Sequence, residues 1–144
     1  MEQEDQFGVS AIFQEYGEHL GREGELKEQL RAVVRELEAA AREIHALLQR
    51  VHRPGGVAGA PALAAQATDR FAAVQALYQQ LDGQLPPNSF WKYCQLWNTT
   101  TSWIAFLAAL TVYLGSEALA TREQVPPSIY PSATCQPVTF SPTI

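Results

Sequence analysis

The 144-residue chain has little of what metal-dependent and nucleophilic enzymes are built on. Its two cysteines, Cys94 and Cys135, lie in unrelated surroundings without ligand-like neighbours, which excludes a disulfide framework and a zinc site. The chain has no glycine-rich phosphate loop, and its third helical stretch, residues 90–115, contains no acidic residue. His45 and His52 are two helical turns apart with no carboxylate between them. We therefore expect no catalytic residue, no metal site and no cofactor.

Long apolar runs and net positive charge are also missing. The most apolar run, residues 103–114, has 12 residues, whereas a membrane span needs about 20. The first five residues are acidic and polar, which does not fit a secretory signal or a transit peptide. A net charge of -5 excludes bulk binding of polyanions, so any contact with nucleic acid has to come from a local patch. The sequence predicts a soluble, intracellular protein with no membrane partner.

What the chain does have is a strong helical pattern near its N-terminus. Ser10 is a suitable N-cap, and no proline follows it before Pro54. From Leu26 to Val51 the apolar residues alternate between spacings of four and three, which is a heptad seam. A flanking row makes the apolar stripe wide enough for a helical bundle; it consists of Val34, Ala41 and Leu48. A continuous helix over residues 11–52 would be roughly 63 Å long.

Two further helices follow. The spacing of apolar residues predicts one over residues 62–82, closed by Gly83, and another over residues 90–115. Residues 103–114 are apolar nearly all round, so they should be buried on every side. A capping box at residues 121–124 announces a fourth helix, but Pro126 and Pro127 stop it.

These patterns predict an all-α fold of about three helices, the first very long. We expect residues 1–9 to be a flexible acidic lead, residues 10–125 a helical domain, and residues 126–144 a disordered tail, since that tail holds five of the nine prolines. Helices two and three are too short to cover the whole seam of the first. The chain is therefore expected to oligomerise or to be poorly soluble.

Several segments resemble the translin family. The resemblance covers roughly residues 9–125 and then stops; the segments that carry it are residues 9–13, 30–34, 41–52, 106–114 and 119–123. It implies a translin-like helical bundle, truncated here because translin chains continue for several more helices. It also implies assembly into a ring-like oligomer that binds single-stranded DNA and RNA, in the cytoplasm and the nucleus. Finally, it implies partnership with translin-associated factor X in an endoribonuclease complex whose catalytic carboxylates come chiefly from that partner.

Few nucleic-acid-binding residues of the family carry over to this chain. A basic cluster early in the third helix is reduced to Lys92 and Trp97, and a basic stretch at the start of the second helix is replaced by uncharged residues. Lys27 occupies a basic position of the first helix. The expected nucleic-acid-binding residues are thus Lys92, Trp97 and Lys27, and the loss of other phosphate contacts predicts weak binding.

Three interpretations remain open at this point. In the first interpretation, which the resemblance favours, the chain is a single-stranded nucleic-acid-binding subunit that is not itself an enzyme. The missing basic stretches instead favour a truncated or divergent paralogue that keeps only the packing surfaces and acts as an assembly subunit. In the third interpretation, the proline-rich tail comes from a spliced or mispredicted transcript, and the natural protein continues past Val125.

Overall fold

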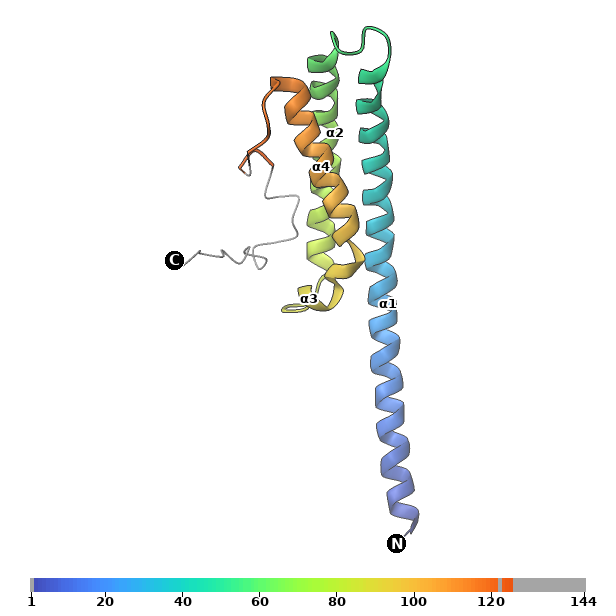
Figure 1. Ribbon diagram of the computed structural model, residues 1–144. Coiled ribbons are helices and arrows are strands. Elements are labelled where there is room, and N and C mark those ends of the chain that lie inside the picture. The colour runs from blue at the N-terminus through green and yellow to red at the C-terminus, as the bar shows by residue number, and fades with distance from the viewer. Residues whose placement is uncertain (1, 122, 126–144) are drawn as a thin grey trace, which may run out of the picture.

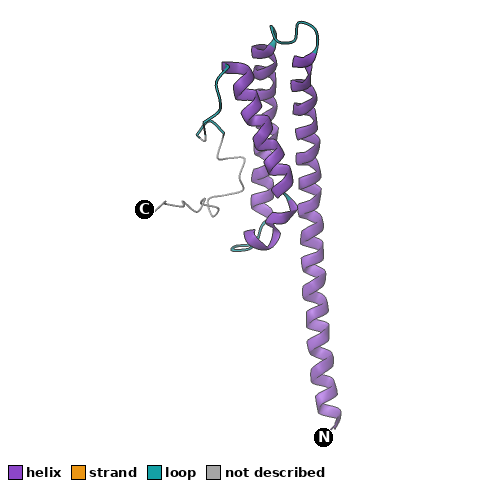
Figure 2. Ribbon diagram, in the orientation of Figure 1, coloured by secondary structure: helices purple, strands orange, loops and turns teal. Residues whose placement is uncertain are grey.

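The protein is described by a computed structural model that places residues 2–121 and 123–125. This part of the chain contains helices and no strands, which confirms the all-α prediction (Figures 1 and 2). The elements are α1 (Glu2–Leu48), η1 (Gln49–His52), α2 (Ala60–Gln84), α3 (Phe90–Tyr93), η2 (Cys94–Leu96) and α4 (Asn98–Ser116). Helices α1, α2 and α4 pack against one another as a three-helix bundle, and about half of α1 extends beyond it.

The heptad seam of α1 forms one side of the core. Leu30, Leu37 and Ile44 are fully buried, while Leu26 and Val51 at the two ends are partly buried. Helices α2 and α4 supply the covering side chains, with a single core cluster shared by all three helices. The chain therefore covers most of the seam, and the expectation of incomplete cover applies only to its partly buried positions, such as Leu26 and Val51. The uncovered apolar residues of α1 lie before the seam, between Val9 and Leu20.

Helix α1 begins earlier than predicted. It starts at Glu2 rather than after Ser10, so the described residues of the expected flexible lead are helical. At its other end α1 passes into the 3₁₀ turn η1, which finishes at His52 as the Pro54 break predicted. The predicted tail, residues 126–144, lies outside the described residues.

Helix α2 presents the predicted apolar face to the bundle. Ala67, Val74 and Leu81 are fully buried on it, and Tyr78 is buried with its hydroxyl 2.7 Å from that of Thr101 on α4. The helix runs past Gly83 to Gln84, two residues further than the sequence suggested. Burial of the Tyr78 and Thr101 hydroxyls is tolerated because each satisfies the other.

The predicted third helix is broken into two. Helix α3 gives way to the 3₁₀ turn η2, and α4 starts at Asn98 after Trp97, whose φ is -122°. The change of direction lets Cys94 and Trp97 enter the core together with Tyr93.

Helix α4 is not buried on every side, as its apolar sequence had predicted. Phe106 is 58% exposed and Tyr113 is 48% exposed, because α1 and α2 together cover only part of its circumference. Beyond α4, the capping contact is present: the side chain of Gln124 accepts a hydrogen bond from the amide of Thr121 at 2.9 Å. The described residues that follow form a turn and no helix, ending before Pro126.

Candidate nucleic-acid interface

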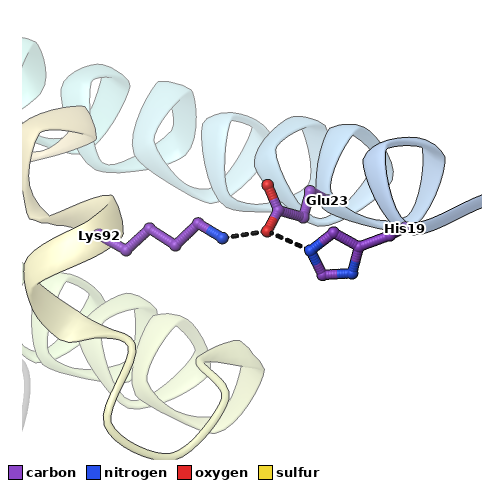
Figure 3. Close-up of polar contacts among 3 residues, drawn as sticks. All are labelled: His19, Glu23 and Lys92. Atoms are coloured by element: carbon purple, nitrogen blue, oxygen red, sulfur yellow. Dashed lines mark hydrogen bonds and ion pairs between the residues drawn. The ribbon is translucent and has the colours of Figure 1, made fainter. Parts of the chain in front are cut away.

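Two of the three predicted nucleic-acid-binding residues lie around one carboxylate, Glu23. The side chain of Lys92, from the short helix α3, forms an ion pair with Glu23 of α1, and His19 Nε2 lies 3.1 Å from the same carboxylate oxygen (Figure 3). Lys27, one turn after Glu23 on α1, acts on its charge through space. The bundle begins at this level of α1, so the site forms where α1 leaves the packed core.

The ion pair shifts the titration of both partners in the direction that keeps them charged. The hydrogen bond from Lys92 lowers the pKa of Glu23; partial burial opposes this shift, and the charges of Lys92, His19 and Lys27 add to it. The hydrogen bond to Glu23 raises the pKa of Lys92. At neutral pH the site therefore contains the charged pair of the Glu23 carboxylate and the Lys92 ammonium group. Half of the Lys92 side chain remains accessible to solvent, as its 50% exposure shows.

Trp97, the predicted stacking residue, is in the core. It is 1% exposed, and its ring meets Phe90 edge-on with the centroids 5.8 Å apart. A base has no access to either face of this ring in the folded bundle. The accessible aromatic residue is instead Trp91, which is 74% exposed and directly precedes Lys92. We refer to His19, Glu23, Lys27, Trp91 and Lys92 as the junction cluster.

Helical spacing is the signal that separates the two tryptophans. Phe90, Tyr93 and Trp97 are three and four residues apart, so they share one face of a helical turn. That face is the apolar one, and Tyr93 is also buried on it. Trp91 and Lys92 belong to the opposite face. Glu23 was missed because the sequence gives no indication that α3 reaches this part of α1.

Two of the other arginines of α1 are paired with acids. Arg42 pairs with Glu38 at 3.8 Å, and Arg31 pairs with Glu28 three residues away. Across the bundle, Arg70 of α2 bonds to Glu43 of α1 at 2.9 Å. These exposed pairs make the polar face of α1 a mixed-charge surface. In the junction cluster, Lys92 directly follows an exposed aromatic residue, Trp91.

The residue types of the junction cluster are ones that can contact single-stranded nucleic acid. Ammonium groups bind backbone phosphates, and an exposed indole ring stacks on a base regardless of its identity. Glu23 weakens this attraction, since a phosphate has to compete with it for Lys92. The described residues contain no group of three or more potential metal ligands. None of the helices in that same part of the chain is both long and apolar enough to cross a membrane.

Comparison with known proteins places this fold in a family. A model of the Translin family matches residues 25–141. Translin from Bos taurus is 38% identical over 117 residues, translin from Homo sapiens 37% and translin from Gallus gallus 32%, each over 81% of this chain and 51% of the relative.

The first and last residues of the family match differ from those that the sequence analysis predicted. It starts at residue 25 instead of 9, and it continues to residue 141 instead of ending at 125. Residues 126–141, which the sequence analysis assigned to a separate tail, thus fall within the family match, and most of the protruding part of α1 falls outside it. The chain spans about half the length of the curated relatives that it matches. With four-fifths of its sequence covered by the family model, the chain belongs to the Translin family.

Proposed function

We propose that this protein is a translin-type subunit that binds single-stranded DNA and RNA and performs no catalysis itself. Its family membership is the observation that carries this proposal. The junction cluster supports it, because Lys92, Lys27 and Trp91 give the chain a cationic, partly aromatic site. In this function the subunit associates with further copies of itself and with translin-associated factor X, holding RNA for an endoribonuclease complex in the cytoplasm and the nucleus.

Titration of a labelled single-stranded oligonucleotide with the full chain at low salt tests the binding step. We expect saturable binding that weakens steeply with salt, since phosphate contacts release counterions. Double-stranded DNA of the same sequence is the control and should bind more weakly, because its bases cannot stack on Trp91. Absence of saturable binding to the single strand would contradict the proposed nucleic-acid binding.

A second function, assembly without nucleic-acid binding, is favoured by two specific observations. The ammonium of Lys92 is already paired with Glu23, and the predicted stacking residue Trp97 is buried. Co-purification with translin or translin-associated factor X, combined with no oligonucleotide binding, would assign this function instead. Incubation with RNA and divalent cations tests the absence of catalysis: cleavage that a chelator abolishes would contradict it.

A further inference from the structure

His19 shares one carboxylate oxygen of Glu23 with Lys92. Its Nε2 lies 3.1 Å from the oxygen that the ammonium group of Lys92 also contacts (Figure 3). The carboxylate is the most covered of the three side chains, with 19% of Glu23 exposed against 57% of His19 and 50% of Lys92. A ligand from solvent therefore reaches the two nitrogen-bearing side chains more readily than the acid between them.

The charges around Glu23 come from two helices. Those that lower its pKa by their charge are His19 and Lys27 of α1 and Lys92 of α3, so the cation from another helix is Lys92 in the part of the chain that the structure describes. Within α1, the other titratable residues about one helical turn from His19 are Glu15, Tyr16 and Arg22. Among these residue types, histidine is the one that ordinarily changes its charge between about pH 5 and pH 8.

The contact with Glu23 determines which ring nitrogen of His19 carries the proton. An ionised carboxylate only accepts hydrogen bonds, so Nε2 has to donate to it. In the neutral ring the other nitrogen, Nδ1, is then an acceptor and repels a phosphate oxygen, whereas in the protonated ring Nδ1 is a second donor. Nδ1 lies on the side of the ring away from Glu23 (Figure 3), so Nδ1–H can bind an anion while Nε2–H remains on the carboxylate.

Protonation of His19 also changes the balance of charge at the site. With a neutral ring, the carboxylate of Glu23 offsets the ammonium group of Lys92. With a protonated ring, one positive charge among the three groups is no longer offset, and the attraction for a phosphate increases. His19 precedes residue 25, where the family match begins, so this position is one that the family model does not describe.

We propose that His19 is a phosphate-binding residue of the junction cluster, which contacts the backbone of a single strand through Nδ1–H when its ring is protonated. This role rests on the proposed nucleic-acid binding and adds a residue and a pH dependence to it. Binding of the strand strengthens as the pH falls from about 8 to about 6. Because linkage is reciprocal, binding of the strand in this interval takes up protons.

Anisotropy titrations with rhodamine-labelled oligo(dT) at about pH 6 and about pH 8, at constant low salt, test this role. Thymine takes up no proton in this interval, so a change in affinity comes from the protein. The unaltered chain should bind about two- to fivefold more tightly at the lower pH, and His19→Gln should lose most of this ratio.

His52→Gln is the matched control. It removes an exposed histidine from η1, at the other end of the bundle, and should keep the affinity ratio of the unaltered chain. His45 is less suitable, because its ring meets that of Trp103 with the centroids 5.8 Å apart. Circular dichroism should give the same helical content for the three proteins, since both substituted histidines are exposed.

Two further measurements separate a direct phosphate contact from an effect of net charge. One more contact should steepen the slope of log affinity against log salt concentration by about 0.7 at the lower pH in the unaltered chain and in His52→Gln, but not in His19→Gln. Calorimetry in buffers with different heats of ionisation should show proton uptake on binding, and His19→Gln should reduce it.

Three outcomes would contradict the role of His19. Equal affinity ratios in all three proteins, or an equal loss of the ratio in both variants, would overturn this role and leave nucleic-acid binding in place. No binding of oligo(dT) by the unaltered chain at either pH would contradict the proposed nucleic-acid binding itself, and the role of His19 with it.

Discussion

Lys92 and Glu23, 69 residues apart in the sequence, form an ion pair that joins the short helix α3 to α1 at the level where the bundle ends. The pair holds the one exposed cation of α3 against a carboxylate, with His19 on the same oxygen. It thereby connects two properties of the chain. It lies at the end of the part of the heptad seam that α2, α3 and α4 cover. It also determines how much positive charge of the junction cluster is available to a phosphate.

Replacing Glu23 by Gln should therefore strengthen binding of single-stranded oligonucleotides. The change removes the competitor for Lys92 and one negative charge beside Lys27. We expect an affinity about two- to fivefold higher at low salt and a steeper dependence on salt concentration. Fluorescence anisotropy with a labelled oligonucleotide measures both. Glu25→Gln, which removes an exposed carboxylate two residues away, controls for the change in net charge.

The stability contributed by this ion pair should depend on pH at both extremes. Because the pKa of Glu23 is lowered on folding, its contribution is present above its unfolded value of 4.5 and is lost as the pH falls through the folded value. Because the pKa of Lys92 is raised, its contribution is present below its unfolded value of 10.5 and is lost as the pH rises through the folded value. Thermal unfolding of the unaltered chain and of Glu23→Gln should therefore differ slightly at neutral pH and converge in acid and in alkali. A difference that persists in acid would contradict this assignment.

Trp91 and Trp97 should respond oppositely to truncation. Trp91→Ala should lower oligonucleotide affinity roughly tenfold, the value of one base stacked on an aromatic ring, and leave stability unchanged. Trp97→Ala should cost about 3–5 kcal/mol of folding free energy, since it empties a fully buried site. Chemical denaturation and anisotropy titration of the two variants distinguish these effects. Loss of affinity in a folded Trp97 variant, with none in Trp91→Ala, would restore the original prediction for Trp97.

The sequence determines more of this fold than of its site. Heptad spacing between Leu26 and Val51 predicted which face of α1 is buried, since apolar periodicity follows directly from helix geometry. The break at Trp97 was missed because it depends on how Cys94 and Trp97 fit between α1 and α2, which local spacing does not encode. The exposure of Phe106 and Tyr113 was missed for the same reason, because apolar sequence alone does not say how many neighbours a helix has.

For the candidate site, the sequence indicated which residues could bind nucleic acid but not which of them lie close together. Lys27 and Lys92 were chosen separately, and only the direction of α3 after the Pro86-Pro87 turn brings Lys92 to α1. The exposure of Trp91 could have been predicted from its helical spacing relative to Phe90 and Tyr93. Whether Lys92, Lys27 and Trp91 bind nucleic acid remains a prediction.

The buried hydroxyl pair should show measurable coupling. Tyr78→Phe removes the group 2.7 Å from the Thr101 hydroxyl and should cost about 1–3 kcal/mol, because buried polar groups that lose a partner keep their desolvation cost. Thr101→Val should cost a similar amount. The double variant should cost less than the two single changes together, by roughly 0.5–3 kcal/mol. Denaturation of the four proteins measures this coupling, and strict additivity would show that the two hydroxyls act independently.

Replacing each of two glycines by alanine should change the folding stability in opposite directions. A Cβ on Gly56 would lie 2.5 Å from the carbonyl oxygens of Arg50 and Val51, and since both are backbone atoms, the loop after η1 has to shift. We expect Gly56→Ala to destabilise the bundle by roughly 1–3 kcal/mol. Gly83, inside α2, would meet nothing within 4 Å, so Gly83→Ala should stabilise it by about 0.5–1 kcal/mol through the better helix propensity of alanine. Urea denaturation of the two variants compares them directly, and equal effects of the same sign would show that the loop geometry around Gly56 does not limit stability.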